Sequence, residues 1–123
     1  MSNILLVEYE AIILIQIGDT YMKLANLCRK SCKFNEAYKL YLDASDTYIK
    51  SHDVYLKLAN LYRKSCKLNN ANKSYISGIY AFNKSIDAYK KYLKLKINII
   101  NIRIEILNQK IHHYNIRTIH NVK

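Results

Sequence analysis

The chain of 123 residues contains no proline and only two glycines, Gly18 and Gly78. Tight β-hairpins usually depend on residues that adopt unusual backbone dihedrals, so this scarcity disfavours a β-sandwich or a β-barrel. Two isolated glycines also cannot form the glycine-rich loop that holds phosphate groups in nucleotide-binding proteins. A helical fold without a nucleotide site is therefore the first expectation.

Acidic residues are scarce as well, with 9 Asp and Glu against 20 Lys and Arg, which gives a formal net charge of +11. A surplus of this size is typical of chains that bind nucleic acid, anionic lipid or an acidic protein surface. The chain is also rich in Ile, Asn and Tyr, which share A/T-rich codons with Lys. A biased base composition would by itself raise the number of lysines, so the charge counts for less as evidence of binding than its size suggests.

Cysteines are few and odd in number: Cys28, Cys32 and Cys66. This count predicts small buried thiols in a reducing compartment, not a disulfide framework. The apolar run over residues 4–17 contains two glutamates and is shorter than the ~20 residues that span a bilayer. No basic segment precedes it, as a signal peptide would require. We expect a cytoplasmic protein, with peripheral association to membranes left open.

What the sequence does contain is a block that occurs twice. Residues 19–33, DTYMKLANLCRKSCK, return as residues 53–67, DVYLKLANLYRKSCK, and a third start appears one period later at Asp87. The tetratricopeptide repeat, a pair of antiparallel helices of about 34 residues, has the same period. Because one helix pair leaves an apolar face in water, such units stack into arrays. The sequence predicts an all-α fold, a short tetratricopeptide-like α-solenoid with units of about 19–52 and 53–86 and a degenerate third from 87.

Each unit has its own expected helix boundaries. Asp19, Asp53 and Asp87 are good N-caps and predict helix starts, and second helices are expected to begin near Asn35 and Asn69. Helical spacing predicts which side chains pack in the first unit: Tyr21, Leu24, Ala25 and Cys28, then Ala37, Tyr41 and Ala44. Their equivalents in the second unit are Tyr55, Leu58, Ala59 and Tyr62, then Ala71, Tyr75 and Gly78.

The two ends are expected to differ from the repeats. Before Gly18, a helical stripe of Leu6, Ile13 and Ile17 is expected to cover the first unit. After Asp87 we expect one long helix to His113, because apolar residues recur three and four apart: Leu93, Ile97, Ile100, Ile104, Leu107 and Ile111. Further isoleucines widen this stripe, which predicts burial on two sides or a surface for a partner. The domain is expected to span 1–113, with a frayed tail over 114–123.

No arrangement of residues indicates catalysis. His112, His113 and His120 lack an acid or cysteine at ligand spacing, and adjacent histidines on a helix point about 100° apart. Cys28 and Cys32 could share a helix face, but Cys32 recurs as Cys66, which is typical of a structural position in a turn. We therefore expect no enzyme activity, no metal and no cofactor.

The basic turn RKSCK occurs twice, at residues 29–33 and 63–67. In a solenoid, translation by one repeat would place the two turns side by side and form a positive ridge for an acidic helix or phosphates. A solvated edge without a function fits the same residues equally well. The candidate partner-binding residues are Lys23, Arg29, Lys30, Lys57, Arg63 and Lys64.

The Ala-Asn pair, the basic turn and the segment EAYKLYLDASDTYIK at residues 36–50 resemble the helical repeats of the soluble NSF attachment proteins, the SNAP family. The likeness covers approximately Asp19 to Tyr92. It implies an adaptor that lays a basic concave face on an acidic SNARE bundle and recruits a disassembly ATPase. Members of that family are considerably longer, and their C-terminal helical bundle has no counterpart here.

Taken together, these features predict a noncatalytic protein-binding repeat module, in a SNAP-like setting of vesicle trafficking. Two alternatives stay open. One is a nucleic-acid binder in which Tyr62, Tyr89 and Tyr92 stack on bases. The other is a structural protein that self-associates through its isoleucine-rich C-terminal helix.

Overall fold

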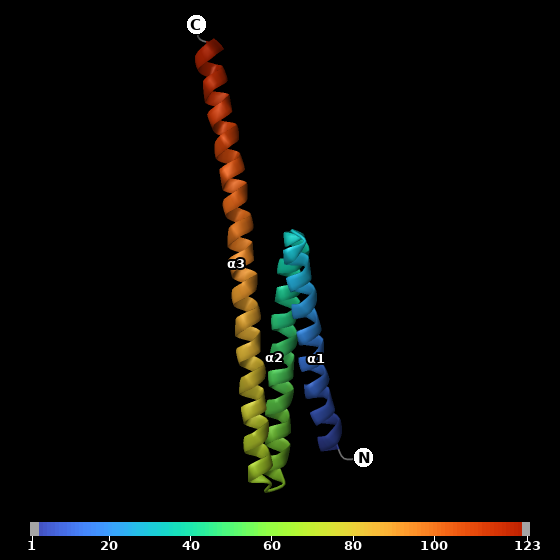
Figure 1. The fold of residues 1–123 in the computed structure, drawn as a ribbon. Coiled ribbons are helices and arrows are strands. Elements are labelled where there is room, and N and C mark those ends of the chain that lie inside the picture. Colours follow the sequence, from blue (N-terminus) through green and yellow to red (C-terminus); the bar gives the residue numbers. More distant parts are fainter. Residues whose placement is uncertain (1–2, 122–123) are drawn as a thin grey trace.

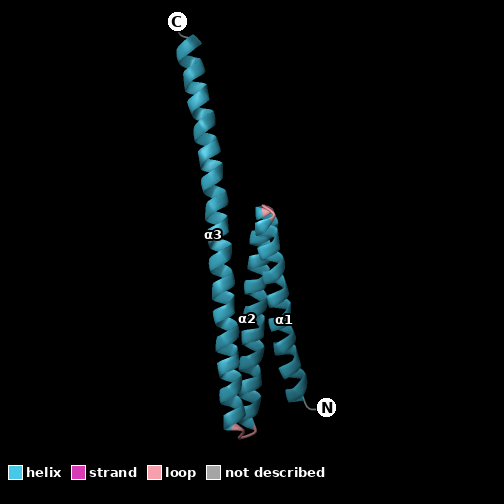
Figure 2. Cartoon of the chain, in the orientation of Figure 1, coloured by secondary structure: helices cyan, strands magenta, loops and turns pink. Residues whose placement is uncertain are grey.

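The structure is a computed structural model that describes residues 3–121, with side chains for residues 3–119. Within that range the chain forms three α-helices: α1 (Asn3–Lys30), α2 (Phe34–Lys64) and α3 (Leu68–Asn121). Two short turns connect them, so that consecutive helices run antiparallel (Figure 1; Figure 2). The expectation of an all-helical fold is confirmed.

Helix α3 is much longer than the other two helices. With 31 residues in α2 and 54 in α3, a rise of 1.5 Å per residue makes them about 46 Å and about 80 Å long. The N-terminal part of α3 packs along α2, and its C-terminal part projects far beyond the turn between α1 and α2 (Figure 1). This projection leaves a long stretch of α3 without a neighbouring helix.

The predicted helix starts at Asp19, Asp53 and Asp87 are wrong, because all three residues lie inside continuous helices. The predicted second helices, near Asn35 and Asn69, are correct to within one residue. An N-cap ends helical geometry on its N-terminal side, and no proline or glycine immediately precedes Asp53 or Asp87 to interrupt the helix. Helix α2 therefore contains the second helix of one repeat and the first helix of the next.

The ends also differ from expectation. Leu6, Ile13 and Ile17 are exposed, and α1 instead buries Val7, Ala11, Gly18 and Ala25. The C-terminal helix is continuous past His113 to Asn121, where a frayed tail was expected. Residues 122 and 123 of that tail lie outside the described range.

The core consists mainly of small side chains, which allow close approach of the helices. On α3 the buried residues recur alternately three and four positions apart: Ala71, Ser74, Gly78, Ala81, Ser85, Ala88, Tyr92 and Leu95. This spacing keeps one face of a helix toward a neighbour over many turns. We call this row the inner seam, and it fixes which sides of α3 remain free.

The sequence repeat reappears as repeated contacts. In the first copy the hydroxyl of Tyr41 donates a hydrogen bond to Asn26 Oδ1, and in the second Tyr75 donates to Asn60 Oδ1. In the first hairpin the Oγ of Ser51 donates to the carbonyl of Ala11. The equivalent residues in the second hairpin are Ser85 and Ser45, and here the Oγ of Ser45 donates to the carbonyl of Ser85. Each copy of the repeat therefore forms one helical hairpin, and the two hairpins share α2 and point in opposite directions (Figure 1).

Gly18 marks the tightest contact between α1 and α2. A Cβ at this position would lie 2.5 Å from a ring carbon of Tyr48, closer than nonbonded carbons approach. The equivalent pair in the second hairpin is His52 and Phe82, whose rings pack at a tilt with centroids 5.2 Å apart. The same aromatic position is thus accommodated by glycine in one hairpin and by a second ring in the other.

Candidate protein-interaction surface

The two basic turns have the same backbone. In the first, the amide of Lys33 donates to the carbonyl of Cys28 and the amide of Cys32 donates to the carbonyl of Arg29, the pattern of a Schellman motif. The second turn repeats both bonds at the equivalent residues. Cys32 and Cys66 adopt positive φ angles of 59° and 58°, in the left-handed region that glycine usually occupies. The sequence assignment of Cys32 to a turn is therefore confirmed.

The predicted ridge of side-by-side basic turns is wrong. The turns lie at opposite ends of α2, because each hairpin points away from the other (Figure 1). Lys23, Arg29 and Lys30 belong to the first hairpin, near the turn between α1 and α2. Lys57, Arg63 and Lys64 belong to the second, whose turn is about 46 Å away along α2. A role in binding for any of the six stays a prediction, but they do not form one face.

A structural role is available for four of these cations. Arg29 and Lys30 lie in the last turn of α1, and Arg63 and Lys64 lie in the last turn of α2. The last turn of a helix carries unpaired carbonyl groups and a partial negative charge, which nearby cations stabilise. Stabilisation of the helix ends is therefore sufficient to explain the repeated basic turn, and no ligand is needed for it.

A cluster of polar side chains joins α1, α2 and α3 around Asp19. Lys84 Nζ lies 2.7 Å from Asp19 Oδ1, and the hydroxyl of Tyr48 donates to the same oxygen. Burial acts to raise the pKa of Asp19, but the hydrogen bonds from Lys84 and Tyr48 outweigh it and hold that pKa below its ordinary value. Burial and the bond to Asp19 raise the pKa of Tyr48. Asp19 thus has a partner in each of the other two helices and acts as a structural tie.

Other predicted features occupy different environments from those expected. Cys32 and Cys66 are exposed and Cys28 is half-buried, so the prediction of buried thiols is wrong. Tyr92 is buried, which removes it from the set of tyrosines proposed to stack on bases. The side chain of His120 lies outside the described range, and the described side chains include no group of three metal-binding residues that could hold an ion.

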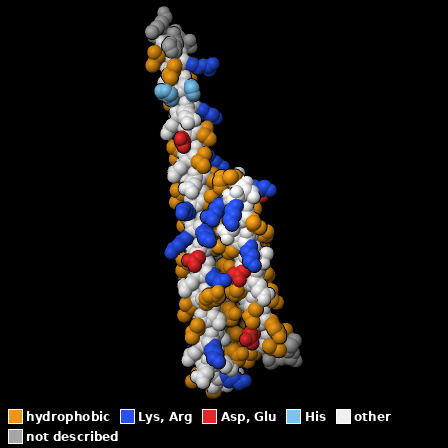
Figure 3. All heavy atoms as spheres, in the orientation of Figure 1, with side chains coloured by type: hydrophobic (Ala, Val, Ile, Leu, Met, Phe, Trp, Pro, Cys, Tyr) orange, Lys and Arg blue, Asp and Glu red, His pale blue; other side chains and the backbone are white. Residues whose placement is uncertain are grey.

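The strongest candidate surface is an exposed apolar stripe on α3. Its members recur three and four residues apart, and none of them is covered by another helix: Leu93, Ile97, Ile100, Ile104, Leu107, Ile111 and Tyr114. Leu107 is 56 % exposed and Tyr114 is 69 % exposed. We call this row the outer seam. Figure 3 shows apolar side chains along the projecting part of the helix, with isolated basic groups among them.

The outer seam leads into an apolar groove between α2 and α3. The groove has a volume of about 460 Å³ and its apolar lining is Ile49 from α2 with Phe82, Ile86 and Tyr89 from α3. This groove was not predicted from the sequence. A partial signal was present, because Ile86 stands seven residues before Leu93 on the same face, although Lys90, which also lines the groove, interrupts the apolar spacing between them.

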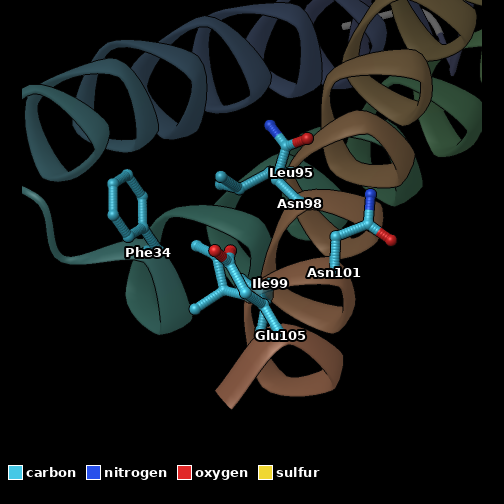
Figure 4. A pocket seen from close by; sticks show the side chains of 7 residues that line it. Phe34, Leu95, Asn98, Ile99, Asn101 and Glu105 are labelled. Carbon is cyan, nitrogen blue, oxygen red and sulfur yellow. The ribbon is translucent and has the colours of Figure 1, made fainter. Parts of the chain in front are cut away.

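A second pocket lies where α3 leaves the other helices. Phe34, at the start of α2, faces Leu95 and Ile99 of α3 around a pocket of about 330 Å³ (Figure 4). Asn98, Asn101 and Glu105 line the same pocket. Every described side chain of α3 after Ile99 is exposed, so this pocket marks the point where the projection begins.

Comparison with protein-family models, curated proteins and solved structures finds no match for the chain. None of the described helices has the length and apolarity needed to cross a membrane. The geometry of the chain is therefore the basis for proposing a function.

Proposed function

We propose that the chain is a noncatalytic module that binds another protein through the outer seam of α3. The single observation that supports this is the projection of an apolar helix beyond the body that the three helices form. Exposure of a contiguous apolar surface to water is unfavourable. On soluble proteins, large surfaces of this kind usually mark sites of interaction with another molecule. Binding of a partner would remove this surface from water.

The basic turns are not required for this function. They are separated along α2 and have a structural role at the helix ends, so their charge does not define a common docking face. The hypothesis of a SNAP-like adaptor that binds an acidic SNARE bundle depends on the likeness of residues 19–92 to that family. In this form of the proposal, binding to a helical bundle would use the outer seam in place of a basic concave face.

The test compares two variants of the full-length chain in affinity capture from the extract of the native cell. Ile104→Asp with Leu107→Asp places charge on the outer seam, and both residues are exposed, so the fold should be kept. Arg63→Glu with Lys64→Glu changes charge at the distant turn and serves as the control. Circular dichroism checks that each variant remains helical.

We expect a protein that wild type and the turn variant retain and that the seam variant loses by at least 10-fold. Identical retention by all three chains would contradict the outer seam as the binding surface. Retention of a reconstituted SNARE bundle by wild type, at physiological salt, would support the SNAP-like form. Its absence would leave the general proposal intact and remove that form.

A further inference from the structure

The projecting part of α3 has the residue order of one strand of a coiled coil. Ile97, Ile104 and Ile111 recur every seven residues, and Ile100, Leu107 and Tyr114 form a second row three residues on. In heptad notation these are the a and d positions. β-Branched residues at a with Leu at d favour two-stranded coiled coils, and the pair Ile104 and Leu107 has this combination, whereas the other d positions are Ile and Tyr.

The two flanks of this stripe differ in charge. One flank, the g positions, carries a cation in four successive heptads: Lys96, Arg103, Lys110 and Arg117. The other flank, the e positions, begins with Lys94 and then carries a neutral amide in three heptads: Asn101, Asn108 and Asn115. All eight side chains are exposed. A charge repeated every seven residues beside an apolar seam selects partners by charge, because e and g residues contact the facing helix.

We infer that the outer seam binds an amphipathic helix of another protein whose flanking residues are acidic. This inference rests on the proposed function and names the chemistry of the partner. Acidic side chains facing Lys96, Arg103, Lys110 and Arg117 would form ion pairs along the seam. Neutral flanks would leave these cations without a counter-charge and basic flanks would repel them, although Lys96 also donates a hydrogen bond to the hydroxyl of Tyr92 within the chain.

A second copy of the chain fits the seam less well. In an antiparallel pair, g positions face g positions, and the four cations would lie against four cations. In a parallel pair Lys96, Arg103 and Lys110 would face the three asparagines, and Arg117 would face position 122, a valine, so every cation would lack a counter-charge. Each copy also brings a net charge of +11, so charge opposes pairing of two copies.

A membrane surface also fits less well than a helix. The outer seam continues through Leu93 and Ile86 into the groove between α2 and α3, where Ile49 forms the opposite wall. At this end, over residues 82–90 of α3, the surface has two helical walls, and such a concave groove accepts a rod, whereas a bilayer is flat. From Ile86 to Tyr114 the surface spans four heptads, or about 42 Å, which matches a partner helix of about 28 residues.

The test uses two synthetic peptides of four heptads each, with Ile at a and Leu at d. One peptide has Glu at every e and g position, and the other has Lys at the same positions. Repulsion between two copies of the same peptide then prevents each peptide from forming a homodimer. Binding of each labelled peptide to the full-length chain is measured by fluorescence anisotropy at physiological salt. We expect the Glu peptide to bind at least 10-fold more tightly than the Lys peptide.

Two variants with equal change of charge separate the flank from the net charge. Arg103→Glu with Lys110→Glu should reverse the preference between the peptides. Arg63→Glu with Lys64→Glu lowers the net charge equally but lies at the turn between α2 and α3, and should leave the preference unchanged. Ile104→Asp with Leu107→Asp should abolish binding of the Glu peptide while the helix content stays the same.

Several results would overturn the inference. Equal binding of the two peptides, or no binding of either, would show that the flank does not select an acidic helix. Sedimentation velocity would be run on wild type and on the seam variant at a protein concentration 10-fold below that of the binding assay. A wild-type dimer that is absent in the seam variant would show that a second copy covers the seam. Binding to vesicles with anionic lipid but to neither peptide would assign the seam to membranes. The proposed function is tested separately by the affinity-capture experiment, which asks whether any protein is retained by wild type and lost by the seam variant, whatever the charge of its flanks.

Discussion

The turn between α1 and α2 and the turn between α2 and α3 share a backbone, a hydrogen-bond pattern and most of their sequence, but their surroundings differ. Near the first turn, α3 passes the start of α2 and buries Leu95 against Tyr41 and Ala37. The chain has no fourth helix within the described range to do the same at the second turn. Equal local sequence therefore gives equal turns, while the packing of each hairpin depends on what lies beside it.

The tyrosines at equivalent positions express this difference most strongly. Tyr41 is completely buried and its hydroxyl lies 2.5 Å from Asn26 Oδ1, whereas the corresponding distance from Tyr75 to Asn60 is 3.5 Å and that bond is exposed. Tyr41→Ala should lower the free energy of unfolding by about 3–5 kcal/mol, the usual cost of emptying an aromatic site in a core. Tyr75→Ala should lower it by about 1 kcal/mol.

Urea denaturation followed by circular dichroism measures both changes. Tyr41→Phe and Tyr75→Phe are the matched controls, since they remove only the hydroxyl groups. Equal losses for the two alanine variants would contradict the claim that α3 makes the first hairpin the more tightly packed one.

The two glycines offer a second contrast. Gly18→Ala brings a Cβ against the ring of Tyr48 and should destabilise the fold by about 1–3 kcal/mol, despite the better helix propensity of alanine. At Gly78 the nearest atom would be Tyr55 Cβ at 3.3 Å, which small shifts can accommodate. Gly78→Ala should therefore change the free energy of unfolding by less than about 1 kcal/mol, because the better helix propensity of alanine offsets the cost of the small shift at Tyr55.

Thermal denaturation of the two glycine variants, recorded beside wild type, distinguishes these outcomes. If Gly18→Ala also carries Tyr48→Leu, the clash should be relieved in part. A Gly18→Ala protein as stable as wild type would show that α1 and α2 are not held at the close distance described.

The positive φ angles predict a third, smaller effect that should be equal in the two turns. A side chain in the left-handed region costs free energy that glycine avoids, although glycine also gains freedom in the unfolded chain. Cys32→Gly and Cys66→Gly should each stabilise the protein by about 0.5–1 kcal/mol. Alanine at either position serves as the control and should give no gain. A stabilisation by alanine equal to that by glycine would argue against a left-handed turn residue.

A last effect, as small as that of the turn cysteines, concerns Asp19. Its equivalent in the second hairpin, Asp53, lacks the matching contact because position 82 is Phe where the first hairpin has Tyr48. Folding lowers the pKa of Asp19, so its carboxylate stabilises the fold above the unfolded-state pKa of about 4. That contribution is lost as the pH falls through the lower folded-state pKa. Since the Asp19 side chain is 42 % exposed, solvent screening limits the cost of Asp19→Asn at neutral pH to about 0.5–1 kcal/mol.

The free energy of unfolding of wild type and Asp19→Asn is compared from pH 7 to pH 2. The difference should shrink toward zero at the acidic end, where Asp19 is protonated. Asp53→Asn is the matched control, since Asp53 is exposed and has only a distant contact with His52, 3.8 Å away. A difference that stays constant with pH would contradict the ionised tie between Asp19 and Lys84.

The sequence predicted the helical class, both turns and the repeat, because these depend on local residues and their spacing. It did not predict that helices continue through Asp53 and Asp87. An aspartate suited to capping predicts a helix start, but the three-and-four spacing from Ala37 through Tyr48 to Leu58 crosses Asp53 without a break. Periodicity over several turns was the stronger signal, since tertiary packing usually decides where helices end.

The candidate surface was half predicted for the same reason. The wide apolar stripe of the isoleucine-rich helix predicts burial on two sides or a surface for a partner, and its exposure in the structure rules out the first. The separation of the basic turns was not predicted, because it depends on the length of α2. The 34-residue period alone is compatible with two short helices per repeat or with one long helix shared by two repeats. The groove with Ile49 depends on how α2 and α3 align, which no local pattern specifies.

The separation of the two turns can be measured directly with the native cysteines. Spin labels on Cys32 and Cys66, in a chain carrying Cys28→Ser, report the distance between the turns by double electron–electron resonance. Because the 31 residues of α2 separate the turns, we predict a distance of about 45–55 Å. Stacked two-helix units would place the labels about 10–20 Å apart, as neighbouring helices are, and that result would contradict the shared helix on which this account depends.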